Sequence, residues 1–310
     1  MHKIIVSVFP TYKCNKNCSF CYLSKHHDNK LLDLDILEKR LEEIVKYFEI
    51  EKFNTYGGEI TLLDTEYLKR LNSILNKYPY AVNYITSNFY DIDKLDLFTN
   101  CLISSSLNEE REDYEFVRSK LKENIGRYKN NNILSMITPS ILNKSSYDVL
   151  ESYNGLGIDW LSFIKYYPSI NTGDLYHITQ QQYEDKLIDL LDCYFKNKDK
   201  FDFNLGLIPG LTKCINKTFP IATNDQIIRI GPDGKFGAIY YTEDNLEYFK
   251  WYDNIEDYII DCKKEAYLYM KKCGSCKYYG TCWTEHITNE QCDGCMKLLK
   301  YMEDYLNDQK

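Results

Sequence analysis

The sequence lacks the features that mark membrane, secreted and nucleic-acid-binding proteins. No apolar run in its 310 residues approaches the ~18 residues that a membrane-spanning helix needs. The first ten residues have only a short apolar stretch and no small-residue cleavage site, unlike a signal peptide. Positive charge is not in excess, because 38 Lys and Arg face 46 Asp and Glu and the net charge is −8. We therefore expect a cytoplasmic protein with no membrane contact and no general affinity for nucleic acid.

Internal repeats and low-complexity tracts are also absent, while an apolar content of 44% is enough for a substantial core. Short apolar runs alternate instead with amphipathic helical patterns over about the first 200 residues, as in βα units around a parallel sheet. Strands are expected at residues 4–9, directly before Tyr56, and at 81–88, 101–107, 133–142 and 158–166. Residues 1–200 therefore predict an α/β fold, a partial (β/α)6 TIM-like barrel, whose functional residues lie at the C-terminal ends of the strands.

The helices of this barrel are predicted from spacing and capping residues. Apolar residues at helical spacing predict one helix with its buried face at Leu37, Leu41, Ile44 and Phe48. A second helix is expected from Leu68 to Leu75. Thr179 and Gln182 fit a capping box at the start of the sixth helix.

The pattern changes after about residue 200. Two apolar runs, 227–230 and 235–241, flank a Pro-Asp-Gly turn and predict a β-hairpin. A cysteine-rich segment follows, and then a final helix with Leu299, Met302 and Leu306 on one face. We expect residues 201–310 to form a small C-terminal domain, a hairpin with helices, that binds a metal cluster.

The cysteines carry the strongest chemical signal. Twelve cysteines in a chain without an export signal indicate metal or redox chemistry rather than disulfides. Cys14, Cys18 and Cys21 follow the first expected strand with C-x3-C-x2-C spacing, which supplies three thiolates and no fourth. A cubane iron–sulfur cluster takes four ligands, so three thiolates leave one iron open to a small molecule. A zinc loop is the alternative, although structural zinc sites close their shell with four protein ligands.

The triad resembles the signature of the radical S-adenosylmethionine (SAM) superfamily. The resemblance implies that the three thiolates hold a 4Fe–4S cluster whose open iron binds the amino and carboxylate groups of SAM. Electron transfer from the reduced cluster would cleave SAM to a 5′-deoxyadenosyl radical, while the protein positions and shields the reaction. An external reductant of the flavodoxin or ferredoxin type is expected as a partner.

The same resemblance assigns SAM-binding residues at the next strand ends. Gly57, Gly58 and Glu59 are similar to the family's second-strand motif, in which glycines allow a close backbone approach to the cofactor. In that motif the backbone, and in some relatives the glutamate, accepts hydrogen bonds from the SAM ammonium group. Ser87 and Asn88 correspond to the polar end of the third strand, which faces the cofactor in relatives.

Three further SAM contacts follow from the resemblance. Ser106 would bond the ribose or carboxylate, and Arg118 would pair with the carboxylate through two parallel hydrogen bonds. Phe20 would help to hold the adenine. Relatives read Ser-Leu-Asp-Gly where this chain has Asn108 and Glu109 in the last two places, and the alternative for Arg118 is a surface position on a helix.

The C-terminal cysteines resemble the core of the SPASM and twitch extensions, which hold auxiliary iron–sulfur clusters in peptide-modifying radical enzymes. The matching residues are Cys273, Cys276 and Cys282, followed by Cys292 and Cys295. One auxiliary 4Fe–4S cluster is expected, with Cys292 as the best candidate for the last ligand and Cys295 as the substitute. A full SPASM domain has a further cysteine where this chain has His286, so a second auxiliary cluster is not expected to be complete. A four-thiolate zinc site is the alternative.

Cys214 is the remaining cysteine with a candidate role. It precedes the predicted hairpin, and either ligates an incomplete second cluster or donates a hydrogen atom to a substrate radical, as in radical epimerases. Cys101 and Cys193 fall in strand and helix patterns and are expected to behave as small hydrophobic residues. His26 and His27 are expected on a solvated loop.

These resemblances imply a radical SAM enzyme that acts on a ribosomally made peptide or protein, giving a cross-link, an epimer or an oxidised product. Peptide maturases often carry an N-terminal domain that binds the substrate's leader. Because the first expected strand begins at residue 4, the leader would bind a separate partner protein or the barrel itself. A radical dehydrogenase or isomerase of a small sugar or metabolite is the alternative enzyme, and a zinc-binding interaction module is the non-enzymatic one.

Overall fold

The computed structural model describes residues 2–23, 30–98, 100–166, 173–217, 227–239, 249–279, 281–282 and 294–309. Within these residues a single sheet has the strand order β10-β9-β8-β1-β2-β3-β4-β5-β6-β7. The strands are β1 (His2–Val8), β2 (Phe48–Thr55), β3 (Val82–Thr86), β4 (Leu102–Ser106), β5 (Asn132–Ile137), β6 (Trp160–Lys165), β7 (Asn204–Leu205), β8 (Ile227–Ile230), β9 (Phe236–Ile239) and β10 (Phe249–Tyr252). Neighbouring strands from β1 to β7 are parallel, and this confirms the predicted α/β partial barrel.

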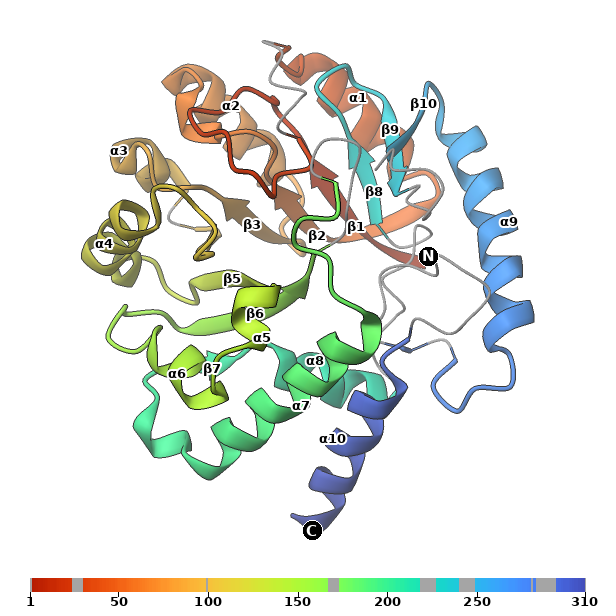
Figure 1. Cartoon of the computed structure of the whole chain (residues 1–310). Coiled ribbons are helices and arrows are strands. Elements are labelled where there is room, and N and C mark those ends of the chain that lie inside the picture. Colours follow the sequence, from red (N-terminus) through yellow and green to blue (C-terminus); the bar gives the residue numbers. More distant parts are fainter. Residues whose placement is uncertain are drawn as a thin grey trace.

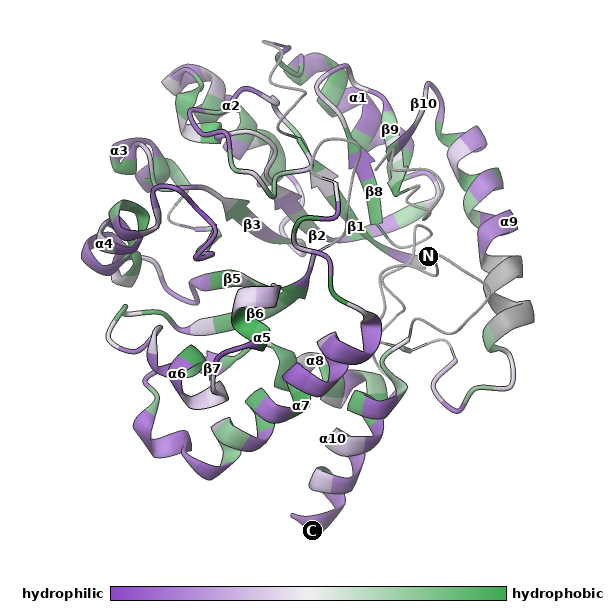
Figure 2. Ribbon diagram, viewed as in Figure 1, coloured by the Kyte–Doolittle hydropathy of each residue, from purple (hydrophilic) through white to green (hydrophobic). Residues whose placement is uncertain are grey.

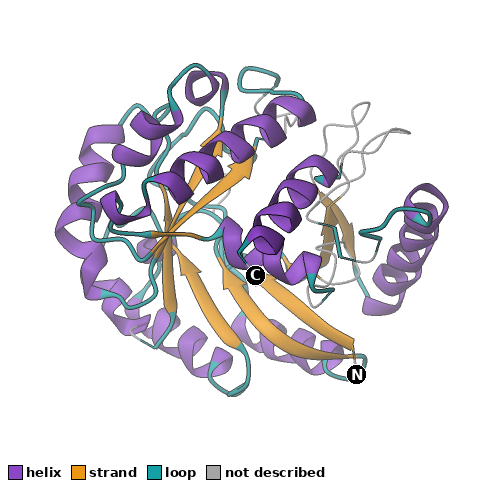
Figure 3. Ribbon diagram, turned by 90° about the horizontal axis from the view of Figure 1, so that it is seen from below, coloured by secondary structure: helices purple, strands orange, loops and turns teal. Residues whose placement is uncertain are grey.

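Helices connect the strands and cover the outside of the sheet. They are α1 (Leu34–Ile44), α2 (Thr65–Leu75), α3 (Ile92–Leu95), α4 (Tyr114–Asn124), α5 (Pro139–Leu142), α6 (Ser146–Glu151), α7 (Gln180–Lys196), α8 (Leu207–Ile215), α9 (Ile255–Cys273) and α10 (Met296–Asp308). Figure 1 shows the chain passing from strand to helix around the barrel, and Figure 3 shows the strands curving inside an arc of helices. Within the described ranges, no helix is both long and apolar enough to span a membrane.

The predicted hairpin is present, but it joins the barrel sheet instead of standing apart from it. β8 and β9 are antiparallel, and Gly234 takes the left-handed backbone conformation of the turn with φ of 74°. β8 also pairs with β1 in parallel, so that Ser7 lies beside Arg229. One sheet therefore continues across the domain boundary predicted at residues 200/201, and that boundary stays a prediction.

Two element limits differ from the sequence-based expectation. Phe48 does not extend the first helix, because α1 ends at Ile44 and Phe48 begins β2 opposite His2. The predicted fifth strand ends at Ile137, and residues 139–142 form α5. Pro139 occupies the first turn of that helix, where its missing N–H costs no hydrogen bond, whereas it cannot donate to a strand ladder. The capping box is confirmed, since Thr179 and Gln182 bond each other's backbone N–H groups.

Two apolar cores separate the sheet from its helices. One lies between β1, β2 and β8 and the helices α1, α2 and α9, and includes Val6, Leu37, Phe53, Ile228 and Tyr258. The other lies under α4, α6 and α7 and extends to α8 and α10, where Leu299 and Met302 are buried as predicted. Figure 2 shows hydrophilic residues along the outward side of α7. Side chains alternate along each strand. One set points outward into these cores and is buried, and the other set points to the inner face of the barrel.

Candidate active site

The cysteine loop leaves β1 at the C-terminal edge of the sheet, as predicted. Cys14, Cys18 and Cys21 are all half-buried on this loop. Burial raises the pKa of each thiol, that of Cys21 to about 12, and the nearby charge of Arg111 opposes the rise at all three. Within the described ranges, no three ligand-type side chains are placed close enough together to hold a metal ion. The donor set nevertheless fits a cluster, because three thiols on one short loop become ligands once they lose their protons.

Gly57 and Gly58 lie directly against the backbone of the cysteine loop. The N–H of Gly58 donates to the carbonyl of Thr11 at 2.8 Å, and the N–H of Glu59 donates to that of Lys13 at 2.8 Å. A Cβ at Gly58 would lie 1.9 Å from the Lys13 carbonyl oxygen, and one at Gly57 would lie 2.5 Å from that of Thr11. The two glycines are therefore required so that the end of β2 can pack against the backbone of the cysteine loop. The sequence predicted a different reason for them, a close approach of the backbone to SAM.

Glu59 joins the end of β2 to the end of β3. Its carboxylate is buried and accepts hydrogen bonds from the Ser87 hydroxyl at 2.7 Å and from the Asn88 backbone N–H at 2.6 Å. The same carboxylate also accepts from the N–H and hydroxyl of Thr61 in the 3-10 turn η1 (Ile60–Leu62). Asn88 in turn donates from its side chain to Asn15 of the cysteine loop at 2.8 Å. The structure thus brings Glu59, Ser87 and Asn88 together beside the loop.

Arg111 is a buried cation at this edge that the sequence analysis did not select. Its Nε donates to Asp113 at 3.1 Å, its Nη1 donates to Ser106 at 3.4 Å, and its Nη2 has no hydrogen-bond partner. Lys16 of the cysteine loop pairs with the other Asp113 oxygen at 2.6 Å. A buried guanidinium with a free donor next to Ser106 fits a carboxylate ligand, such as that of SAM. The signal for it in the sequence was the lone cation in the acidic run 109–113.

Arg118, the residue selected by its distance from Ser106 in the sequence, lies elsewhere. It is on α4, and its guanidinium donates to the backbone carbonyl of Ser152 at 2.7 Å. This bond stabilises the C-terminal end of α6, because the last carbonyls of a helix have no partner within it. Phe20 is half-buried on the cysteine loop, one residue before Cys21. Its predicted contact with adenine stays a prediction.

Four of the later cysteines share one apolar core. Cys214 and Cys295 are buried in it, and Cys282 packs against it from a partly buried position. Burial raises the pKa of the Cys214 and Cys295 thiols. Cys295 is buried at the start of α10, where the Gln180 side chain donates to its sulfur at 3.6 Å. Cys276 packs against the same core. Cys273 ends α9, and its carbonyl accepts from the Cys276 N–H at 2.8 Å.

Some of the other cysteines and histidines named in the sequence analysis are described by the structure, and some are not. Cys292, His286 and the histidines at 26 and 27 lie outside the described residues. Cys214 is fully buried in the core on α8. Cys101 is buried as predicted, and Cys193 is half-buried on α7.

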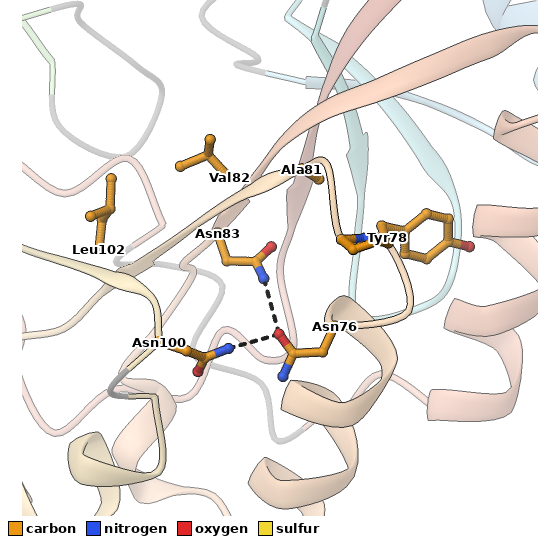
Figure 4. Close-up of a pocket in the computed structure, with 8 residues that line it drawn as sticks. Asn76, Tyr78, Ala81, Val82, Asn83, Asn100 and Leu102 are labelled. Atoms are coloured by element: carbon orange, nitrogen blue, oxygen red, sulfur yellow. Dashed lines mark hydrogen bonds between the residues drawn. The ribbon is translucent and has the colours of Figure 1, made fainter.

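A surface pocket of about 250 Å³ lies far from the cysteine loop. It opens where β3 and β4 begin, at the opposite end of these parallel strands. Asn76 accepts hydrogen bonds there from the side chains of Asn83 and Asn100, at 3.5 and 2.7 Å (Figure 4). These amides tie the end of α2 to the two strands, so we interpret the pocket as part of the scaffold.

Comparison with known proteins identifies the family. The sequence model of the radical SAM superfamily matches residues 8–174, which include the cysteine loop and the first five helical connections. The chain belongs to the radical SAM superfamily. This membership implies a 4Fe–4S cluster and SAM as cofactors. The three thiols are suitable ligands for the cluster, and the free N–H donor of Arg111 is suitable for the carboxylate of SAM.

Solved structures of radical SAM enzymes share the fold. anSMEcpe with bound AdoMet and the Cp18Cys peptide has a TM-score of 0.68 and 15% sequence identity, over 99% of this chain and 98% of that chain. SuiB of Streptococcus suis bound to S-adenosylmethionine has a TM-score of 0.60 and 15% identity, over 91% and 72%. SuiB bound to its precursor peptide SuiA has a TM-score of 0.56 and 14% identity, over 76% and 59%. No curated protein sequence matches the chain significantly.

Proposed function

We propose that this radical SAM enzyme modifies a peptide or protein substrate. The observation that carries the proposal is the fold similarity to anSMEcpe with its Cp18Cys peptide, which extends over nearly the whole of both chains. SuiB, solved with its precursor peptide SuiA, supports the same substrate class. The bound cluster and SAM supply the radical that removes a hydrogen atom from the substrate, and the protein residues orient the reactants and exclude water.

Two groups of residues have distinct roles in this proposal. Cys14, Cys18 and Cys21 would hold the cluster, and Arg111 with Ser106 would orient the SAM carboxylate. Glu59 already accepts four hydrogen bonds from its own chain, so its role is to hold the ends of β2 and β3 in position.

The proposal is tested by anaerobic reconstitution with iron and sulfide, followed by SAM, a reductant and a candidate peptide encoded beside the gene. We expect a broad brown absorbance, 5′-deoxyadenosine, and a mass change in the peptide. A reconstituted protein that forms 5′-deoxyadenosine and changes a small sugar but no peptide would contradict the substrate class. Stoichiometric zinc, with no iron and no 5′-deoxyadenosine, would contradict the enzyme itself.

Arg111→Gln is expected to weaken SAM binding roughly tenfold or more, because a charge-assisted hydrogen bond to a carboxylate is lost. Arg118→Gln is the matched control, and its SAM affinity should stay unchanged because Arg118 bonds Ser152. Isothermal titration of SAM into the reconstituted proteins measures both affinities. A larger loss in Arg118→Gln would show that the spacing in the sequence identified the correct arginine.

We also propose an auxiliary 4Fe–4S cluster held by Cys273, Cys276, Cys282 and Cys295. Its support is that Cys295 is buried in the core against which both Cys276 and Cys282 pack. Cys295 takes the fourth place in this proposal because it is buried in the core against which Cys282 packs. Cys214 is buried in the same core, and its complete burial favours a place near the cluster over direct hydrogen donation to a substrate.

Cys295→Ala is expected to lower the iron content from roughly eight to roughly four atoms per chain, because a four-iron cluster that loses one of four thiolates is not retained. Cys193→Ala, a half-buried cysteine on α7, is the matched control and should keep all the iron. Iron and sulfide analysis after reconstitution measures the change. Full iron in Cys295→Ala, combined with loss in Cys292→Ala, would assign the ligand to Cys292 instead.

The electron donor and the substrate's leader complete the proposed set of partners. A flavodoxin- or ferredoxin-type reductant would supply the electron. A separate leader-binding protein, or the barrel itself, would hold the leader of the peptide.

A further inference from the structure

The side chain of Arg229 lies on the inner face of the barrel. Ile228 and Ile230, its neighbours on β8, both pack into the core under α1 and α9. Since side chains alternate along a strand, Arg229 points to the opposite face. There it lies beside Ser7 of β1 in the register of the sheet. Figure 1 shows β8 next to β1.

Arg229 is buried, and no described residue supplies it with a counter-charge. Only 5% of its surface is exposed, its Nη1 donates to the Ile227 carbonyl at 3.2 Å, and its Nε has no hydrogen-bond partner. In the described part of the chain no carboxylate pairs with it. Removing a charge from water is costly unless an anion and hydrogen bonds replace the solvent. The described surroundings of Arg229 therefore lack an anion.

An aromatic cluster connects Arg229 to the candidate active site. The guanidinium lies 5.6 Å from the ring centroid of Phe249, which is 5.3 Å from Trp251 and 5.5 Å from Phe9. Phe249 also contacts Tyr22, the residue after Cys21, at 5.6 Å. One ring thus separates Arg229 from the cysteine loop.

Glycines in the hairpin make room for this cluster. A Cβ at Gly231 or Gly237 would lie 2.9 or 2.6 Å from the ring of Trp251. Such contacts are shorter than carbon atoms allow, so Trp251 can lie flat against the hairpin only because these positions have no side chain. The place next to Arg229 is therefore closely packed on the hairpin side.

Beyond the bulge of β2, the inward positions that the structure describes on β1 to β6 add positive charge and no carboxylate. Glu51 is an extra residue in β2, a bulge that lets Ile50 and Phe53 both reach the outer core while Lys52 turns inward. Lys52 lies over the ring of Tyr84 at 3.8 Å, and burial lowers its pKa to about 8. The inward positions beyond this bulge on β1 to β6 are Ile5, Ser7, Lys52, Asn54, Val82, Tyr84, Thr86, Leu102, Ser104, Ser106, Asn132, Leu134, Met136, Trp160, Ser162 and Ile164.

We infer that Arg229 binds a carboxylate of the substrate, from an acidic side chain or a chain terminus, at the inner face of the barrel beside the cysteine loop. The inference rests on the proposed function in taking the bound molecule to be a substrate. A carboxylate would accept hydrogen bonds from the guanidinium edge that carries the free Nε, and would neutralise the buried charge. The inner face of an acidic protein would then attract an acidic segment of a peptide.

The test measures binding alone, without SAM or reductant, so it is independent of catalysis. The probes are acetyl-glutamate methylamide and its neutral counterpart acetyl-glutamine methylamide, each followed by ligand-observed NMR with the full-length reconstituted protein. We expect the acidic probe to bind the unmodified protein at least roughly tenfold more tightly than the neutral one. We expect Arg229→Gln to remove this preference. Equal affinity for the two probes, or an unchanged preference in Arg229→Gln, would overturn the inference.

Arg40 provides the matched control, because its guanidinium stacks on Phe236 of the same hairpin at 4.8 Å but is paired with Glu43 at 2.8 Å. Arg40→Gln should lower the Tm and leave the probe preference unchanged. Arg229→Gln should not lower the Tm, since it removes an unpaired buried charge. If Arg229→Gln fails to fold, Arg229→Lys serves in its place. That variant keeps the charge and loses the planar donor edge, so a retained full preference would overturn the inference.

Discussion

Cys18→Ala is expected to abolish the formation of 5′-deoxyadenosine from SAM. Cys18 is one of only three thiols on the loop, and a cluster with two protein ligands cannot be retained with one iron open to SAM. The loss should reach the detection limit, roughly a thousandfold or more, because the radical has no other source in a radical enzyme of this class. Anaerobic assay with dithionite as reductant, followed by chromatography of the products, measures it.

Cys101→Ala is the matched control for this substitution. Cys101 is buried at the start of β4, away from the loop, and its loss removes one small buried group. The variant should lose about 1 kcal/mol of stability at most and keep its 5′-deoxyadenosine formation. SAM cleavage that survives in Cys18→Ala but not in Cys101→Ala would refute the assignment of the triad.

Gly58→Ala is expected to have the largest effect of any single methyl addition. The new Cβ would lie 1.9 Å from the carbonyl oxygen and 2.5 Å from the carbonyl carbon of Lys13, and both atoms are backbone. Neither can move without shifting the cysteine loop or breaking the bonds from Gly58 and Glu59 to it. We expect a loss of roughly 3 kcal/mol in the free energy of unfolding, or a loop that no longer takes up iron.

Gly126→Ala is the corresponding control, because the nearest atom to its added Cβ lies 3.9 Å away in ordinary contact. Its free energy of unfolding should change by less than about 1 kcal/mol, and its iron content should stay the same. Chemical denaturation and iron analysis on both variants measure the difference. Equal stability and equal iron in the two would show that the Gly-Gly segment does not support the cysteine loop.

Local features of the sequence were sufficient to predict the barrel. Alternation of strand and helix patterns, the Pro-Asp-Gly turn and the capping box each depend on residues a few positions apart. The predictions at Phe48 and at residues 139–142 were wrong because an apolar pattern continued beyond the end of the helix or strand. Helical spacing continued into β2 at Phe48, and an apolar run continued from β5 into α5. In the first case pairing with His2 ended the helix, and that partner lies 46 positions away.

The candidate site was predictable to the extent that it depends on residue type and spacing. Three cysteines at C-x3-C-x2-C define the loop, and the Gly-Gly-Glu segment could be placed at the next strand end. The sequence did not show that Gly58 supports Lys13, since that contact spans 45 positions. Two arginines follow Ser106 closely, and only the direction of each side chain distinguishes Arg111 from Arg118.

The sequence by itself determined the family and the class of chemistry, because both follow from the identity and spacing of ligands on one loop. The tertiary structure decided which distant groups meet. It gathered Cys214, Cys282 and Cys295 at one apolar core, and it placed Arg229 beside Ser7 of the first strand. The physical reason is that burial and charge pairing depend on the sheet register and on helix packing, which bring together residues far apart in the sequence, such as Ser7 and Arg229.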